Sequence, residues 1–208
     1  VTGVQTCALP ISGKQAVAQL TESLLIRGTK TKSRQQLQDE MQRLNATINT
    51  TGGLASSGVS ISTTAENLIP ALKLAVEILR EPAFPDADFA QIRRQRVAAI
   101  DRGRTEPGTL VSQALQANLS PYPRNDVRHI RTIDEEIEDL NKVTLDDVRK
   151  FHTAFYGASQ GELVILGPID NAAVEREASA LLGAWKSASP YARIVSNAKD
   201  VQKLNTKI

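Results

Sequence analysis

The sequence predicts an α+β domain in which helices pack on one face of a small, mostly antiparallel sheet. Apolar residues recur at helical spacing over most of the chain. One segment in the first third instead alternates apolar and polar residues around two glycines, and a short apolar run after residue 160 ends in turn residues. The 208 residues, 41% of them hydrophobic, are enough to form a core within one domain.

Two amphipathic helices open the predicted fold. Residues 13–27 and 33–44 both place apolar side chains at intervals of three and four positions. Gly28 follows the first segment as a C-terminal stop, and Ser33 with Gln36 has the spacing of a capping box. We therefore expect a short turn between two core-facing helices.

Residues 45–63 change to a period of two, which is typical of strands with one buried face. We expect residues 45–51 and 54–62 to pair as an antiparallel hairpin joined through Gly52 and Gly53, because glycines permit positive φ. A helical conformation across residues 46–50 would contradict the predicted architecture.

Most of the remaining chain is predicted to be helical. The expected helices span residues 66–80, 86–104, 108–119, 132–140, 144–155 and 170–182. Capping boxes are expected at the starts of three of them, in residues 63–66, 132–135 and 144–147. The run Glu162–Leu166 is almost wholly apolar and predicts a central strand that is buried on both faces.

Charge and hydropathy exclude several function classes. The 25 basic and 23 acidic residues are interspersed, which disfavours phosphate-backbone binding, so we expect no nucleic-acid partner. No apolar run approaches the roughly 18 to 20 residues of a membrane span. Arg93, Arg94 and Arg96 give the helix at 86–104 a basic face, for which we expect solvent contact or, as the alternative, a cavity that receives an acidic partner.

Catalytic side chains are scarce. His129 and His152 are the only histidines, and they lie 23 positions apart without an adjoining metal-binding spacing, so both are expected to be structural. Cys7 is the single cysteine and excludes an intrachain disulfide. The residues alone therefore indicate an α+β domain without an evident active site.

The chain is expected to have three parts. Residues 1–12 are assigned to an artefact or a disordered terminus, because the first eleven resemble a translated sequencing adapter. Residues 13–186 form the α+β domain. Residues 187–208 are rich in Ser, Asn and Lys without sustained periodicity, and they are interpreted as a linker to a following domain.

Five blocks resemble the pitrilysin/insulinase family of zinc metallopeptidases in order and approximate spacing. They are Leu25–Ser33, Glu81–Phe89, Phe151–Tyr156, Leu163–Gly167 and Leu181–Lys186. The resemblance implies a protein made of two bowl-shaped halves that enclose a chamber where extended peptides are cut. It also implies that strands normally precede the first helix, so that this chain lacks about two of them, and it favours a bacterial periplasmic location.

The resemblance places the zinc-binding H-x-x-E-H motif of the family on Gln19, Glu22 and Ser23, where only the glutamate is present. The third zinc ligand of the family is a later glutamate, and this sequence has none between Glu81 and Glu106. The chain thus resembles the non-catalytic, C-terminal half. No catalytic residue, metal ligand or cofactor is expected here, and zinc is expected in the other half.

The resemblance also implies partners. These are a catalytic half, in the same protein or an adjacent subunit, and a peptide substrate that adds to an edge strand. The expected peptide-binding residues are Thr47, Ile48, Asn49, Thr50 and Thr51. Two alternatives remain: a structural or assembly subunit of the same family without peptidase activity, and an unrelated α+β binding domain.

Overall fold

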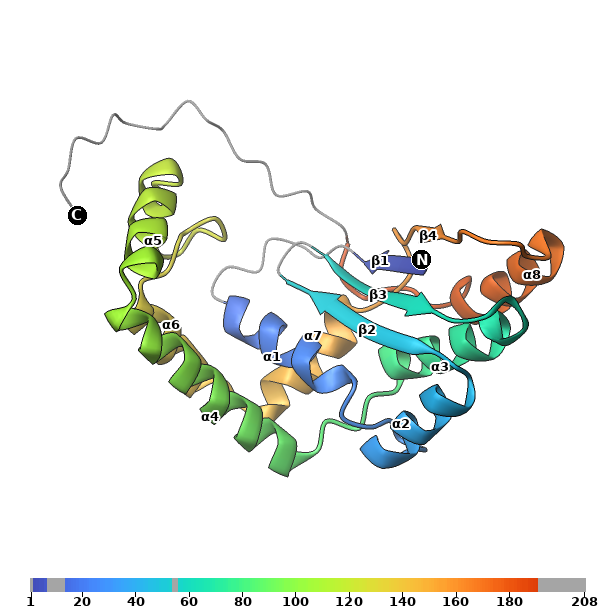
Figure 1. Cartoon of the computed structure of the whole chain (residues 1–208). Coiled ribbons are helices and arrows are strands. Elements are labelled where there is room, and N and C mark those ends of the chain that lie inside the picture. The colour runs from blue at the N-terminus through green and yellow to red at the C-terminus, as the bar shows by residue number, and fades with distance from the viewer. Residues whose placement is uncertain (1, 7–13, 54–55, 191–208) are drawn as a thin grey trace.

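Helices cover one face of a four-stranded antiparallel sheet (Figure 1), so the predicted α+β class is confirmed. The structure is a computed structural model that describes residues 2–6, 14–53 and 56–190. Its elements are β1 (Thr2–Thr6), α1 (Gln15–Leu25), α2 (Arg34–Arg43), β2 (Thr47–Gly52), β3 (Ser57–Ser62), η1 (Ala65–Asn67), α3 (Leu68–Arg80), α4 (Asp86–Arg102), η2 (Gly103–Thr105), α5 (Pro107–Leu119), α6 (Ile133–Lys142), α7 (Leu145–Phe155), β4 (Leu163–Val164) and α8 (Asn171–Leu182).

The core lies between the sheet and the helices beneath it. From the sheet, Ile48 of β2 and Val59 and Ile61 of β3 are buried at its inner face. From the helices, the fully buried side chains include those of Leu20, Leu24, Leu25, Leu72, Ile78 and Leu79. Alternation along the strands and helical spacing along α1 and α3 bring these apolar residues to one interface, as the sequence predicts.

The strand order is β2-β3-β1-β4. The sequence-based expectation gave residues 1–12 no place in the fold, whereas Thr2–Thr6 form β1, which pairs with β3 on one side and β4 on the other. Sheet pairing links segments far apart in sequence, so periodicity within residues 13–186 could not indicate this position. The sheet consequently has more strands than the sequence predicts.

Local capping signals are confirmed at three helices. Ser33 with Gln36, Thr132 with Glu135, and Thr144 with Asp147 each form both hydrogen bonds of a capping box. At residues 63–66, by contrast, the expected capping box is absent, because the Thr63 hydroxyl donates to the main-chain oxygen of Leu44 at 2.8 Å. A short 3₁₀ turn, η1, precedes α3 there instead.

The predicted central strand at 162–166 is wrong in length and position. Strand β4 has only Leu163 and Val164, lies at the edge of the sheet, and leaves Val164 46% exposed. An apolar run alone does not distinguish a central strand from an edge strand.

The predicted hairpin is confirmed, but its turn differs. Gly52 pairs with Ser57 inside the sheet, and the Gly53 N–H donates to the Ser56 oxygen at 2.9 Å. Among the described glycines, positive φ occurs at Gly28 and Gly167, so the expected use of the glycine pair for positive φ is wrong at Gly52 and Gly53. Gly52 has a different role, at its contact with α1.

The basic face predicted on α4 is divided between two environments. Arg93 packs over the Phe89 ring at 5.1 Å and donates to the Val143 oxygen at 3.0 Å, so it fastens α4 to the segment between α6 and α7. Arg94, in contrast, is exposed. The interhelical role of Arg93 has no signal in the local sequence.

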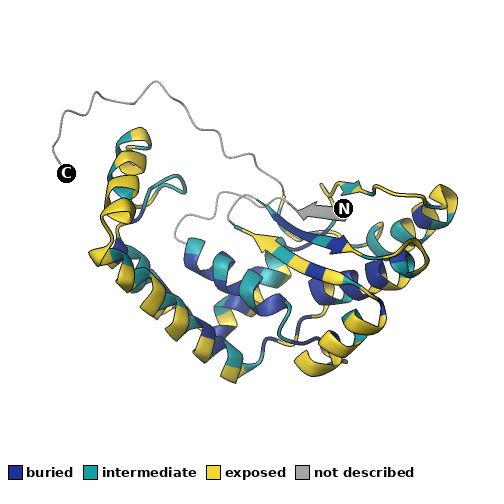
Figure 2. Cartoon of the chain, in the orientation of Figure 1, coloured by how far each residue is buried: buried dark blue, intermediate teal, exposed yellow. Residues whose placement is uncertain are grey.

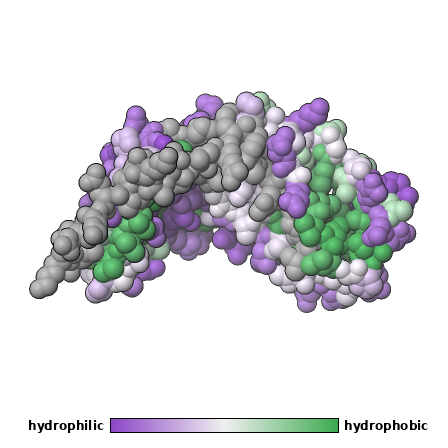
Figure 3. Space-filling model, turned by 90° about the horizontal axis from the view of Figure 1, so that it is seen from above, coloured by the Kyte–Doolittle hydropathy of each residue, from purple (hydrophilic) through white to green (hydrophobic). Residues whose placement is uncertain are grey.

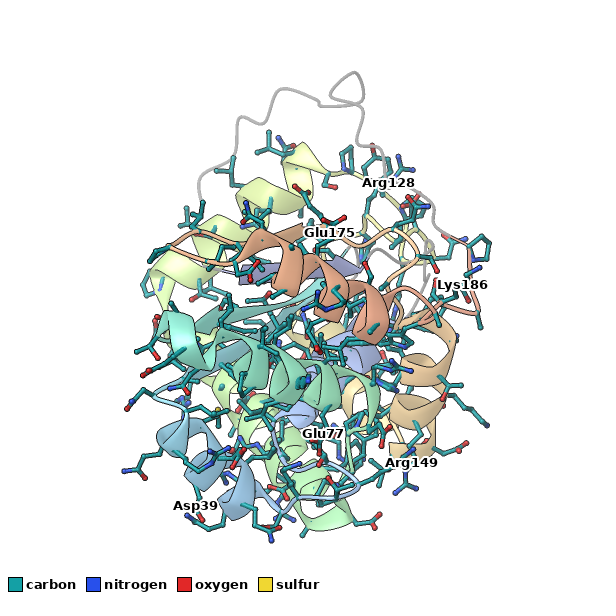
Figure 4. All side chains as sticks on the ribbon, turned by 90° about the vertical axis from the view of Figure 1, so that its right-hand side faces the viewer. Asp39, Glu77, Arg128, Arg149, Glu175 and Lys186 are labelled. Atoms are coloured by element: carbon teal, nitrogen blue, oxygen red, sulfur yellow. The ribbon has the colours of Figure 1, made fainter. Side chains whose placement is uncertain are left out.

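Glu77 of α3 anchors the turn between α1 and α2, and Figure 4 shows it among the lower helices. One carboxylate oxygen accepts from the hydroxyls of Thr29 and Thr31, each at 2.6 Å, and the other accepts from Lys32 Nζ at 2.6 Å. Burial would raise the pKa of this carboxyl, but the three donors outweigh it and the pKa is lowered. The ionised carboxylate is therefore the form that holds the turn.

We predict that Glu77→Ala lowers the free energy of unfolding by about 2 kcal/mol at pH 7, because the buried Thr29 hydroxyl loses its acceptor. Since the folded-state pKa is lowered, the stabilisation is full above the ordinary glutamate pKa of about 4.3 and is lost as pH falls through the folded value. Urea unfolding at pH 7 and pH 3 should show the difference between variant and wild type shrinking in acid. Glu40→Ala, which removes a pair with exposed Arg43, is the control and should change little. An equal loss in both variants would contradict this role.

Candidate functional site

The three positions matched to the zinc motif lie together on one partly exposed strip of α1. Gln19, Glu22 and Ser23 share a face because they are three and four positions apart. The Ser23 hydroxyl donates to the main-chain oxygen of Gln19 at 2.9 Å and is 3.3 Å from Glu22 Oε2. The structure thus brings the predicted positions together, and their side chains bond locally.

Glu22 connects α1 to the edge strand β2. Its Oε1 accepts from the Thr50 hydroxyl at 3.1 Å. At Gly52 of the same strand, an added Cβ would lie 2.6 Å from Glu22 Cγ and 2.8 Å from its Cβ, so the glutamate stem rests directly on the glycine. Glu22 therefore fastens the strand to the helix, and this packing explains a glutamate here without a metal.

The helix expected to carry the third ligand does lie beside α1. Gln19 lines a cavity of about 10 Å³ together with Ile100 of α4 and with Arg131 and Glu136. The α4 residue that faces this position is therefore apolar. A zinc site needs imidazole, thiolate or carboxylate donors, and an amide, a hydroxyl and an isoleucine do not provide them.

A buried ion pair lies next to the matched positions. Arg131 is only 5% exposed, and its guanidinium donates from Nε to Asp139 of α6 and from Nη1 to Gln15 Oε1 of α1 at 2.7 Å. Burial raises the pKa of neighbouring Glu136, while the charges of Arg131 and Arg96 oppose that shift. These charges stabilise the junction of α1 and α6, and the sequence carries no signal for them because the partners are 8 and 116 positions from Arg131.

Within residues 2–6, 14–53 and 56–190, no group of three His, Cys, Asp or Glu side chains could hold a metal ion. The donors at the matched positions do not fit zinc, so no hydrolytic step is assigned to this chain. On this face, Glu22 of α1 bonds to Thr50 and packs on Gly52 of the edge strand β2.

Both histidines make structural hydrogen bonds. His129 lies between the Tyr122 main-chain oxygen, 2.8 Å from Nδ1, and Glu135 Oε2, 2.9 Å from Nε2. His152 donates from Nε2 to the Leu79 oxygen at 2.7 Å, and burial lowers its pKa. These contacts agree with the expectation that both histidines are structural.

The strand expected to bind peptide is an edge strand of the sheet. Thr47, Asn49 and Thr51 are exposed, Ile48 is buried and Thr50 faces α1. Because the Gly53 N–H bonds to Ser56, and hydrogen-bonded pairs alternate along an antiparallel ladder, residues 47, 49 and 51 bond to β3. The N–H and C=O groups of Ile48 and Thr50 consequently point toward the open edge.

We predict that Gln19→His with Ser23→His gives no stoichiometric zinc binding, because the carboxylates that line the cavity beside Gln19, those of Glu136 and Asp139, already lie against the charge of Arg131. Adding Ile100→Glu should strengthen binding measurably, since that residue lines the same cavity as Gln19. Isothermal titration with zinc compares the double and triple variants with the unmodified chain. Stoichiometric zinc in the unmodified chain would contradict the assignment of this face.

We predict that Arg131→Met destabilises the fold by about 3 kcal/mol, because it leaves the Asp139 carboxylate without its buried partner. Arg124→Met is the matched control, since its ion pairs with Glu138 and Asp139 involve an exposed guanidinium, and it should unfold close to wild type. Urea unfolding at pH 7 measures both variants. A value near zero for the Arg131 variant would show that this pair does not hold α1 to α6.

Comparisons with known proteins place these features in a family context. A family model described as "Peptidase M16 inactive domain" matches residues 142–208, a range that includes the segment predicted as a linker. An "Uncharacterized zinc protease" from Rickettsia bellii is 24% identical over 170 residues, which are 81% of this chain and 40% of that protein.

Solved structures show the same fold. A "peptidase M16 inactive domain" from Pseudomonas fluorescens superposes with a TM-score of 0.77 at 22% identity, over 93% of this chain and 48% of that one. A protease from Helicobacter pylori gives 0.74 at 21%, over 92% and 46%, respectively. The periplasmic protease PqqL from Escherichia coli gives 0.70 at 15%, over 94% and 22%.

The chain spans less than half the length of each of these relatives. None of the helices described here is long and apolar enough to cross a membrane. The resemblance drawn from the five sequence blocks is confirmed: this chain resembles the inactive, C-terminal half of the pitrilysin/insulinase (M16) zinc metallopeptidases, and its residues 142–208 match the inactive domain of that family.

Proposed function

We propose that this chain belongs to the non-catalytic half of a two-part zinc peptidase, where it forms part of the chamber wall and binds extended peptide along β2. The observation that carries the proposal is the outward direction of the Ile48 and Thr50 main-chain groups at an open sheet edge. Such an edge is a template for an added strand, and main-chain hydrogen bonds there hold a peptide without regard to its sequence.

The surroundings of β2 suit this role. Glu22 bonds to Thr50 and packs on Gly52, so the strand is held against α1. Among the described strands, none pairs with the outer edge of β2. Thr47, Asn49 and Thr51 present small polar side chains beside the edge, which would accept varied neighbours on an added peptide. Zinc and the hydrolytic step are assigned to the catalytic half, which is the proposed partner, in the same protein or an adjacent subunit.

A periplasmic location is part of the proposal. Its support is that one structural neighbour is named a periplasmic protease.

We predict that Thr50→Pro raises KM for an extended peptide at least fivefold, because proline removes an N–H that faces the open edge and spares the bonds to β3. Thr50→Val is the matched control: it loses the hydroxyl bond to Glu22 but keeps the N–H, and KM should stay near wild type. The assay uses this chain assembled with the H-x-x-E-H half encoded in the same gene or beside it, and a quenched fluorescent peptide.

Two results would contradict the proposal. Equal KM values for both variants and wild type would show that peptide does not add to β2. An assembled pair without zinc-dependent peptidase activity would instead favour a structural or assembly subunit of the family.

A further inference from the structure

A pocket of about 550 Å³ lies where α4, α5 and α6 meet, and side chains from residues 99–116 and 130–136 line it. We name it the α5 pocket. Helix α5 forms one of its walls and is largely exposed at one end of the molecule (Figure 2). Gln113 of this helix donates to the main-chain oxygen of Arg131 at 2.7 Å, which joins the wall to the base of the pocket. The volume lies within the range of roughly 300 to 1,000 Å³ that is typical of small-molecule sites.

Glu136 lines this pocket and differs from the other acidic side chains of α6. The other four each have a basic partner: Asp134 pairs with Arg104, Glu135 with His129, Glu138 with Arg124 and Lys142, and Asp139 with Arg131. Glu136 accepts no hydrogen bond from any described residue. It is half-buried, and burial raises its pKa. A carboxylate that has lost hydration without gaining a donor is costly, so a cation that reaches it would be bound favourably.

The basic side chains near Glu136 do not bond to it. Arg131 is 5% exposed, and its described N–H bonds go to Asp139 and Gln15. Arg96 acts on Glu136 through its charge and does not line the pocket. The rim adds one charge of each sign, from the exposed side chains of Arg102 and Glu106. An anion in the pocket would therefore meet a carboxylate that has no donor, whereas a cation would supply that donor.

An organic cation suits the α5 pocket better than a metal ion does. In the part of the chain that the structure describes, no group of three His, Cys, Asp or Glu side chains could hold a metal ion. The lining offers apolar surface for an alkyl stem, from Ile100, Ile130 and Ile133, and polar oxygens on α5, from Thr109, Gln113 and Gln116. Hydrophobic and hydrophilic side chains border each other at this end of the molecule (Figure 3). Ammonium and guanidinium groups carry several N–H donors and need several such acceptors.

We propose that the α5 pocket binds the ammonium or guanidinium group of an organic cation, with Glu136 as the acceptor and the isoleucines along the alkyl stem. Two sources carry this chemistry: a lysine or arginine side chain of a peptide, and a free alkyl cation. Glu136 also lines the cavity of Gln19, and Glu22 on the same face of α1 bonds to Thr50 of β2. The peptide source rests on the proposed function and adds a preferred side chain to it, whereas the pocket itself does not depend on that function.

The first arm of the test uses a peptide source. Two sets of fluorescein-labelled peptides carry lysine or norleucine at each position in turn, and fluorescence anisotropy measures their binding to the full chain. The best lysine peptide should bind at least fivefold more tightly than its norleucine counterpart, because a charge-assisted hydrogen bond forms at Glu136. Glu136→Gln should abolish this difference. Glu138→Gln is the matched control and should keep it, because it removes the same charge from the same helix at an exposed position outside the pocket.

The second arm uses a free cation. Saturation-transfer NMR with butylguanidinium should give a signal in the full chain and in Glu138→Gln, and Glu136→Gln should reduce it at least fivefold. A Glu136-dependent preference for lysine supports the proposal and identifies the peptide side chain as the source. Glu136-dependent binding of butylguanidinium without a preference for lysine supports it and identifies a free cation. The proposal is overturned if neither probe depends on Glu136, or if both variants weaken binding equally.

Urea unfolding separates binding from a structural role. Because Glu136 has no hydrogen bond to lose, Glu136→Gln should keep or raise the urea midpoint. A lower midpoint would overturn the proposal, since the carboxylate would then stabilise the fold through Arg96 and Arg131.

The outcomes also separate the pocket from the proposed function. If Thr50→Pro raises KM as expected but no probe depends on Glu136, the pocket is wrong and the proposed function stands. If butylguanidinium binding depends on Glu136 but Thr50→Pro leaves KM unchanged, the pocket stands and the peptide-binding role of β2 is wrong.

Discussion

Burial of helix α1 is the constraint on which the rest of the structure depends. Seven of its eleven residues are buried, and the helix contacts β2 on one side and α4, α6 and α7 on the others. Each fully buried leucine contributes on the order of 2 kcal/mol, so Leu20, Leu24 and Leu25 together are comparable to the net stability of a small domain. Gln19, Glu22 and Ser23 lie on the partly exposed side of α1, outside this buried set. The residues at these three positions can therefore change without altering the buried residues that stabilise the fold.

This separation explains how a peptidase-like fold persists without zinc ligands. The side chains around Gln19 form their own network, in which Arg131 pairs with Asp139 and reaches Gln15. Such a network satisfies polar groups that would otherwise be buried without partners. Glu22 is held by Thr50, and the charge of Arg131 is neutralised from α6. At the positions matched to the zinc motif, this chain instead has contacts that join α1 to α6 and β2.

The sequence predicts the local features of the fold well and the distant ones poorly. Helix positions and the capping boxes at Ser33, Thr132 and Thr144 depend on residues within four positions of each other, and the structure confirms them. The place of β1 between β3 and β4 depends on pairing across the chain, as does the edge position of β4, and neither leaves a local pattern.

The family resemblance located Gln19, Glu22 and Ser23 on one face of α1. It could not indicate that Ile100 lies opposite Gln19, or that Arg131 would be the buried charge beside it, because both are tertiary facts.

The contact between Glu22 and Gly52 limits how this chain can change over time. A side chain at position 52 would overlap the stem of Glu22, and shortening Glu22 would leave Thr50 without its acceptor and open space above the strand. A substitution at either position alone should therefore destabilise the fold, and substitutions at the two positions should be epistatic. A larger residue at position 52 should be tolerated only where the residue at position 22 is small. Steric coupling to a neighbouring strand can thus retain a glutamate at position 22 that has no part in any chemistry.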